Sequence, residues 1–485
     1  MVFNSGMMDS AYQELDQIFH PRSIAVIGAS NRPGNAAGMF LLAHRVLGFK
    51  GSVYAVAPTG DELPDFPTYR NLNDIPGPVD YVIIAVPAMY LPEVISDCAR
   101  KNVRSAVIFT SGFSETGEPA GLELEEMIRK KARETGMRLI GPNCMGIYYP
   151  HGGLSFRPDL PPGEGPGEVS YLSQSGGMAF GAIFLGNRFG LKYHKVVSYG
   201  NEADLCSPEL LDYFTEDPET KIILAYLEGT RDGRALARAL IRAGAKKPVV
   251  VLKGGLSETG VRAAASHTGA MGGAQATWEA VFRQAGAIQV DNLDEMVGIA
   301  QVLRRLPKFT GRKMIIVSIS GGLSVNFTDR AEFWGFEVPE LSPETNGRLR
   351  LSFNLPGTSV KTPIDMAAAF MMFPIYPEVF QTLDEDAGSD LILLVINIEF
   401  FTYGERLVPG ITESSMNAFL EAIKEVKKPL AVVLPSVINE EKRLVYEQLF
   451  VRAGFPVFES VDRALKVLDL ARRYHQRNSS LGCFT

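Results

Sequence analysis

Short apolar runs without polar alternation recur along this 485-residue chain and constrain its fold more than any other feature. A strand with one face in water alternates apolar and polar residues, whereas a strand buried on both faces does not. Helix-like stretches, such as residues 91–101 and 121–135, separate the runs. This order predicts an α/β fold built on parallel sheets with helices on both faces. The first expected strands are residues 23–27, 52–56, 81–86, 106–109 and 139–140.

Two connectors divide the pattern into three consecutive α/β units. Residues 150–167 are dense in Pro and Gly, and residues 307–312 are polar and contain a proline, so neither segment favours a regular element. We therefore expect domains at residues 1–149, 150–307 and 308–485. Residues 279–306 are expected to form one helical run that closes the second unit. The later expected strands are residues 168–172, 195–198, 222–227, 249–252, 313–317, 391–395 and 430–434.

The composition excludes several classes of protein. With 46% hydrophobic and 21% charged residues, the chain is typical of a globular protein and not of a disordered one. No apolar run approaches the roughly 18–20 residues that cross a bilayer, and the N-terminus lacks the features of a secretion signal. The net charge of −7 without a basic block argues against nucleic acid as a partner. Four widely spaced cysteines predict neither a disulfide framework nor a metal site. We expect a cytoplasmic protein without membrane partners.

Glycine-containing turns follow three of the expected strands. They are residues 28–34 (GASNRPG), 173–177 (SQSGG) and 318–322 (SISGG). A helix N-terminus exposes unpaired N–H groups at the positive end of the helix dipole, so a turn of this kind is able to hold an anion. The first turn lacks the GxGxxG pattern, and each turn is also compatible with an ordinary tight connection.

His267 differs from the other histidines in its surroundings. It lies in residues 263–269 (AAASHTG), among small side chains that follow an expected strand and a glycine pair. Small neighbours leave an imidazole exposed on a loop, as a nucleophile or a phosphate carrier requires. An ordinary loop histidine is the alternative that the residues leave open.

Five motifs in one order give the chain a resemblance to a known family. They are residues 19–30 (FHPRSIAVIGAS), 141–146 (GPNCMG), 173–176 (SQSG), 200–204 (GNEAD) and 266–269 (SHTG). Together they resemble the α subunit of NDP-forming acyl-CoA synthetases, the superfamily of succinyl-CoA synthetase and ADP-forming acetyl-CoA synthetase. The resemblance extends from about residue 15 to residue 475.

The resemblance implies a CoA-binding Rossmann-like domain followed by two flavodoxin-like domains. It also implies a reversible reaction in which acyl-CoA, NDP and phosphate give the carboxylic acid, CoA and NTP through an acyl phosphate and a phosphohistidine. His267 matches the phosphorylated histidine, and Glu228 matches the carboxylate that orients it. A histidine carrier divides a transfer between distant sites into two in-line displacements, and a carboxylate on its other nitrogen stabilises the developing charge.

Ligand contacts follow from the same resemblance. Phe180 matches an acyl-substrate contact. Val86 and Pro87 lie at a strand's carboxyl end, where ligands bind in open α/β sheets. The other residues expected to bind CoA are Ser30, Asn31, Arg32, Pro33, Phe109, Thr110 and Ser111. The residues expected to bind phosphate are Ser173, Gln174, Ser175, Gly176, Gly321 and Gly322.

The chain departs from the family pattern in three places. The family commonly has Asn-Pro-Lys after the second strand, with the lysine on a CoA phosphate, whereas residues 57–59 are Ala-Pro-Thr. Thr59 thus removes an expected cation. In the third domain a Gly-Gly-Pro-Gly type turn is replaced by residues 321–324 (GGLS), and an Asn-Pro-x-Asp element by residues 362–365 (TPID).

The resemblance also implies a partner. Three α/β units leave no room for an ATP-grasp domain, so we expect a separate ATP-grasp β-type subunit in an α2β2 hetero-oligomer, with the nucleotide and Mg²⁺ bound there. The alternative is an FdrA-like or regulatory CoA-binding homologue without synthetase activity. An NAD-dependent dehydrogenase is disfavoured because GxGxxG and an acidic residue after the second strand are both missing. The residues identify neither the acid nor a preference between ADP and GDP.

Overall fold

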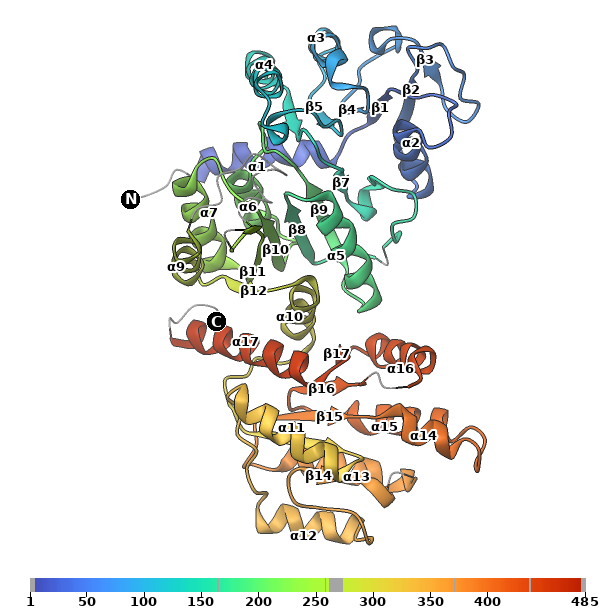
Figure 1. The fold of residues 1–485 in the computed structure, drawn as a ribbon, viewed down its shortest axis with the longest axis vertical. Helices are drawn as coiled ribbons and strands as arrows, with labels where there is room; N and C mark the ends of the chain where they lie inside the picture. Colours follow the sequence, from blue (N-terminus) through green and yellow to red (C-terminus); the bar gives the residue numbers. More distant parts are fainter. Residues whose placement is uncertain are drawn as a thin grey trace. The chain divides into compact units, whose positions relative to one another are not determined.

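The structure is a computed structural model that describes residues 5–163, 165–257, 259–260, 274–369, 371–435 and 438–480. The chain divides into two compact units. The first comprises Met1–Asn187 and Leu191–Met296, and the second comprises Arg188–Gly190 and Val297–Thr485. Two sheets belong to the first unit and a third sheet to the second unit (Figure 1).

The first sheet is parallel and has the strand order β3-β2-β1-β4-β5-β6, which is that of a Rossmann fold. β1, β4 and β5 are buried along their whole length, which explains why their sequences show no polar alternation. The strands are β1 (Ser23–Ile27), β2 (Ser52–Val56), β3 (Thr68–Tyr69), β4 (Tyr81–Ile84), β5 (Ser105–Ile108) and β6 (Arg138–Ile140). The helices of this region are α1 (Ser5–Phe19), α2 (Ala36–Val46), α3 (Leu91–Arg100) and α4 (Pro119–Thr135), with short 3-10 turns at Leu72–Asp74, Ala88–Tyr90 and Ser114–Thr116.

The second sheet has the order β12-β11-β10-β8-β9-β7. Its strands from β8 onward are parallel and follow the flavodoxin-like order, while β7 pairs antiparallel with β9 at the edge. The strands are β7 (Gly146–Tyr148), β8 (Val169–Ser173), β9 (Tyr193–Ser198), β10 (Ile222–Leu227), β11 (Val249–Lys253) and β12 (Ile288–Val290). The helices are α5 (Gly176–Arg188), α6 (Ser207–Glu216), α7 (Gly233–Lys246), α9 (Gln275–Ala285) and α10 (Leu293–Arg305), with a 3-10 turn at Pro150–Gly152.

The expectation of one helical run over residues 279–306 is wrong. Gly286 ends α9 with a φ of +71°, a conformation that glycine adopts without strain. The chain then pairs Ile288 and Val290 with β11 before α10 begins. Both side chains are buried. Burial of two β-branched residues at the sheet edge therefore prevails over the helical pattern on either side.

The third sheet is parallel, with the order β14-β13-β15-β16-β17, again flavodoxin-like. Its strands are β13 (Met314–Ser318), β14 (Ile364–Asp365), β15 (Leu391–Val395), β16 (Leu430–Val433) and β17 (Val457–Phe458). The helices are α11 (Gly321–Phe333), α12 (Pro343–Ser352), α13 (Tyr376–Glu385), α14 (Ile398–Gly404), α15 (Ile411–Ile423), α16 (Glu440–Arg452) and α17 (Val461–Ser480), with 3-10 turns at Ala367–Ala369 and Phe373–Ile375. The three-unit α/β architecture is confirmed, and the boundaries at 149/150 and 307/308 stay predictions.

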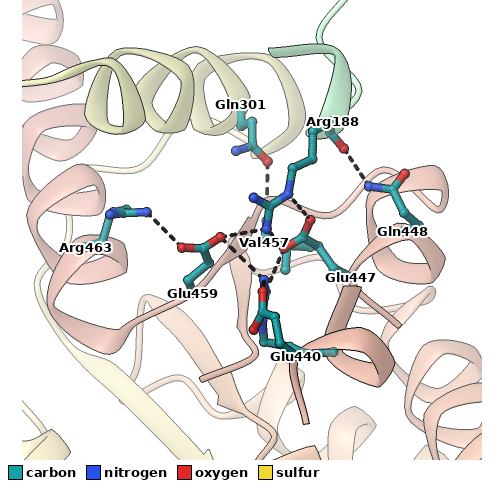
Figure 2. A network of polar contacts seen from close by, with 9 residues as sticks. Arg188, Gln301, Glu440, Glu447, Gln448, Val457, Glu459 and Arg463 are labelled. Atoms are coloured by element: carbon teal, nitrogen blue, oxygen red, sulfur yellow. Dashed lines mark hydrogen bonds and ion pairs between the residues drawn. The ribbon is translucent and has the colours of Figure 1, made fainter. Parts of the chain in front are cut away.

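A buried ionic network lies in the second unit. The Glu447 carboxylate accepts hydrogen bonds from the Arg188 guanidinium at 2.7 and 2.8 Å and from Arg443 at 2.7 Å. Figure 2 shows Glu459 beside the same Arg188 guanidinium, which donates to it at 2.6 Å. The Glu447 side chain is fully buried and that of Arg443 is 1% exposed, so their charges are held by one another and not by water.

None of the helices in the described part of the chain combines the length and apolar character needed to cross a membrane.

Candidate functional site

The first glycine turn connects β1 to α2 at the carboxyl edge of the first sheet. Gly28 has a φ of +100°, and a Cβ there would lie 2.5 Å from the carbonyl oxygen of Ala85, so only glycine fits. Asn35 caps α2, because its side-chain oxygen accepts a hydrogen bond from the Gly38 N–H at 2.9 Å. The turn therefore holds the N-terminus of α2 next to the end of β4.

A cleft of about 740 Å³ opens at this edge, where the strand order reverses between β1 and β4. Ligands of open α/β sheets bind at such a reversal. Most residues predicted to contact CoA near the first turn line the cleft, while Asn31, also described, does not. Those that do are Ser30, Arg32, Pro33, Val86 and Pro87.

A second cleft of about 600 Å³ shares Val86 and Pro87 with the first. Phe109, Thr110 and Ser111 line it on the side of the first sheet. Its other lining residues are Ala85, which the first cleft also shares, and Ala88, Asn143, Cys144, Met145, Gln174, Ser175, Gly176 and Gly177. The structure thus brings residues predicted for CoA and residues predicted for phosphate to one cleft within the first unit. Burial raises the pKa of the Cys144 thiol to about 12, which leaves it protonated and a poor nucleophile.

The second glycine turn begins α5 at this cleft. The Ser173 hydroxyl donates to the Ser175 carbonyl at 2.7 Å, and so Ser173 supports the turn from behind without lining the cleft. A Cβ at Gly176 would lie 2.6 Å from Cγ of Met145. Close packing therefore favours glycine here, and the first residues of α5, Gly176 and Gly177, line the cleft.

Gln174 is 2% exposed and joins this turn to the end of β10. Its side-chain oxygen accepts hydrogen bonds from the N–H groups of Glu228, at 2.5 Å, and Gly229, at 3.1 Å. Its side-chain nitrogen donates to the Glu202 carboxylate at 3.0 Å and to the Gly229 carbonyl at 3.2 Å. The amide is fully satisfied, so it fixes the backbone that carries Glu228.

Lys253 adds a buried cation next to Glu228. It ends β11, is 4% exposed, and donates to the Glu228 carbonyl at 2.8 Å and to the Gly254 carbonyl. Its ammonium lies 4.8 Å from the ring centroid of Trp278. Burial lowers the pKa of Lys253 to about 8, while the negative charge of Glu228 acts in the opposite direction. Sequence reasoning missed this residue, although a lysine at the end of the apolar run VVVLK is a signal for a buried cation.

The remaining predicted residues are placed as follows. His267 lies outside the described residues. Phe180 is half-buried on α5. Its ring centroid lies 4.7 Å from the ring centroid of Phe184 and 4.5 Å from the guanidinium carbon of Arg157. Glu228 is 5% exposed at the end of β10.

The third glycine turn, in the second unit, has an acidic neighbour. A Cβ at Gly321 would lie 2.7 Å from a carboxylate oxygen of Asp365, while Gly322 has open space beside it. Asp365 ends β14, and its other oxygen accepts a hydrogen bond from the Ala367 N–H at 2.9 Å. A carboxylate therefore lies at the start of α11, where the sequence predicted phosphate, and the phosphate-binding role of this turn stays a prediction.

Comparisons with known proteins match two domains of this chain. A CoA-binding domain model matches residues 22–150, and a succinyl-CoA ligase like flavodoxin domain model matches residues 166–303. The acetate–CoA ligase (ADP-forming) II subunit alpha of Pyrococcus furiosus is 34% identical over 92% of this chain and 94% of its own length. The chain belongs to the α subunits of the ADP-forming acid–CoA ligases. It is thus a subunit of an enzyme, as the resemblance implied.

Other members of the ligase family extend the comparison. The subunit alpha of acetate–CoA ligase (ADP-forming) I of P. furiosus is 31% identical over 94% of this chain and 96% of its own length. The solved structure of the dinucleotide forming acetyl-coenzyme A synthetase 1 of Ca. Korarchaeum cryptofilum, in complex with phosphate and ADP, is 29% identical with a TM-score of 0.79. The match covers 96% of this chain and 97% of that chain. In the acetate–CoA ligase (ADP-forming) II of Archaeoglobus fulgidus, this chain covers 68% of a longer protein.

Proposed function

We propose that this α subunit binds CoA in the first cleft and carries out acyl and phosphoryl transfer at the second. In the direction of acid release, phosphate attacks the thioester carbonyl and CoA leaves, which gives an acyl phosphate. A nitrogen of His267 then attacks phosphorus, the carboxylate leaves, and phosphohistidine forms. NDP takes the phosphoryl group to become NTP, and the reverse sequence makes acyl-CoA.

One observation carries the proposal: the second cleft is lined both by residues predicted for CoA, such as Thr110, and by the turn predicted for phosphate, at Ser175 and Gly176. A thioester and a phosphate must meet for the first step. The N-terminus of α5 supplies N–H groups and a positive dipole end to a phosphate there. Cys144, which also lines this cleft, is a poor nucleophile because burial raises the pKa of its thiol.

Glu228 is the proposed partner of His267. A carboxylate that accepts from one ring nitrogen of an imidazole holds the other nitrogen as the nucleophile and stabilises the positive charge that develops. Gln174 and Lys253 both bind the backbone of Glu228, so the carboxylate starts from a fixed main chain. An imidazole titrates near neutral pH, which lets it take and release a phosphoryl group reversibly.

A partner subunit completes the proposed enzyme. Relatives named as subunit alpha and longer relatives such as the A. fulgidus protein both support a second component. We infer an ATP-grasp β-type subunit in an α2β2 arrangement, with the nucleotide and Mg²⁺ held by the partner. Co-expression with an ATP-grasp protein and a screen of carboxylic acids for CoA-dependent ADP release would test the partner and identify the acid.

Phosphoryl labelling tests the carrier. The chain, supplied with its partner and labelled NTP, should acquire acid-labile, base-stable label, and His267→Ala should abolish it. His151→Ala is the matched control, since His151 is exposed and lies outside both clefts. Label that persists in His267→Ala would refute the assignment of the carrier.

Two further measurements separate the alternatives. Glu228→Gln should slow labelling about 10- to 100-fold without changing CoA affinity. The substitution removes only the negative charge of the side chain proposed to accept from the second ring nitrogen of His267. Calorimetric titration should show binding of CoA and none of NAD. A protein that binds CoA but acquires no label with any partner would instead fit a regulatory homologue.

A further inference from the structure

Arg70 reaches the first cleft from a strand that the sequence did not predict. β3 pairs in parallel with β2, with Tyr69 opposite Val56, and the Ala57 N–H donates to the Tyr69 carbonyl at 2.8 Å. Arg70 is the next residue and lines the cleft. It therefore stands at the carboxyl edge of the sheet, level with the residues that follow β2.

The side chain of Arg70 lies against the backbone of Gly60. A Cβ at Gly60 would be 3.1 Å from a terminal nitrogen of the guanidinium, so the absence of a side chain leaves room for it. Gly60 has a φ of +84°, which also favours glycine. The neighbouring Thr59 hydroxyl is already used, since it donates to the Asp61 carboxylate at 2.6 Å.

Arg70 is exposed, and among the described residues no carboxylate forms an ion pair with it. The other charges of the cleft are Arg32, Glu93 and Asp97. Asp97 is already engaged, because it pairs with Arg100 and accepts a hydrogen bond from the Asn71 amide at 3.2 Å. The cleft thus presents two guanidinium groups, from Arg32 and Arg70, in a chain whose net charge is −7.

We propose that Arg70 binds the ribose 3′-phosphate of CoA and makes this cleft prefer CoA over dephospho-CoA. In a Rossmann-like sheet the residues at the end of the second strand meet the ribose of the bound nucleotide, and an arginine there accommodates a ribose phosphate. A guanidinium donates two parallel hydrogen bonds to a phosphate, which a lysine does not. The inference rests on the proposed function of the cleft as the CoA site.

Calorimetric titration of the full-length chain with CoA and with dephospho-CoA tests the assignment. The unmodified chain should bind CoA about 10- to 100-fold more tightly than dephospho-CoA, the range of a charge-assisted hydrogen-bonded contact. Arg70→Ala should weaken CoA binding by that factor and leave dephospho-CoA binding unchanged. Arg70→Lys should recover part of the preference. Arg45→Ala is the control, because Arg45 pairs with Asp65 at 2.8 Å and does not line the cleft.

The outcomes separate this inference from the function on which it rests. The assignment of Arg70 is overturned if the Arg70→Ala chain keeps the preference for CoA, or if it binds both ligands more weakly by the same factor. In either case, CoA binding by the unmodified chain still supports the proposal that the cleft is the CoA site. An unmodified chain that binds neither ligand overturns both. Because Arg70 is exposed, the variants should unfold at the same temperature as the unmodified chain, and a melting curve for each verifies this.

Discussion

The side-chain oxygen of Gln174 accepts a hydrogen bond from the backbone N–H of Glu228 at 2.5 Å. One residue follows β8 and the other follows β10, and these strands are neighbours where the order of the second sheet reverses. The buried Gln174 amide therefore connects the glycine turn before α5, which is predicted to bind phosphate, with the end of β10, where Glu228 lies. The turn that lines the second cleft and Glu228, which does not line it, therefore share one rigid connection.

Replacing Gln174 with alanine should affect both stability and turnover. The change leaves the N–H groups of Glu228 and Gly229 without their acceptor, so we expect a loss of about 1–3 kcal/mol in the free energy of unfolding. The backbone of Glu228 would also move, and phosphoryl transfer should slow about tenfold or more. Denaturant unfolding and ADP release measure the two effects, with Gln381→Ala, an exposed glutamine, as control. Unchanged turnover would mean that the Gln174 amide has no influence on phosphoryl transfer.

Phe180 is expected to influence the choice of acid. It lies four residues after Gly176 on α5 and hence on the same helix face, one turn below the second cleft. Phe180→Ala should raise KM for the preferred acid several-fold and improve the use of bulkier acids, with no change in the Kd for CoA. Phe184→Ala, one turn further along α5, is the matched control. Identical acid profiles for the two variants would remove Phe180 from the substrate site.

Much of the fold was predictable because long buried strands leave a clear signal. β1, β2, β10 and β15 begin and end at the predicted residues, since each contains at least four consecutive apolar residues. The strands that were missed, such as β3, β12 and β14, have only two or three residues. So few residues show no periodicity, and pairing at the sheet edge determines their structure.

The candidate site was predictable in part for related reasons. Its glycine turns are local in sequence and were located correctly. The hydrogen bond between Gln174 and Glu228 joins residues 54 positions apart, and no local sequence pattern predicts it. Arg70 was missed because it follows the short strand β3. The sequence indicated only that Thr59 removed a cation, whereas the sheet brings another one to the same edge.

His44 should make the first domain sensitive to acid. Its ring lies 1% exposed in α2, with Nδ1 2.7 Å from the Phe40 carbonyl, and burial lowers its pKa to about 4 from an ordinary 6.5. Above pH 6.5 the ring is neutral in both the folded and the unfolded chain. As the pH falls from 6.5 to 4 only the unfolded chain takes up the proton, so stability declines by about 2–3 kcal/mol.

His44→Gln tests this dependence because glutamine retains a hydrogen-bond donor but does not titrate. Between pH 7 and pH 4.5 the variant should lose less stability in urea than the unmodified chain does. His20→Gln serves as control, since the His20 side chain is half exposed. Parallel pH profiles for the unmodified chain and His44→Gln would contradict the prediction.

Glu447 should be the most sensitive position in the second unit. Its buried carboxylate accepts hydrogen bonds from both Arg188 and Arg443. Glu447→Ala would remove the fully buried carboxylate that pairs with Arg443, itself 1% exposed, and would leave it only the more exposed Glu440 and Glu459. Breaking a buried ion pair from one side costs about 3–5 kcal/mol.

Removing both charges in the double variant Arg443→Met with Glu447→Leu should cost less than the single change, because no buried charge is then left unpaired. Thermal unfolding compares these variants with Glu421→Ala, whose pair with Lys424 is exposed and should matter little. If Glu447→Ala unfolds no earlier than that control, the network (Figure 2) contributes nothing to stability.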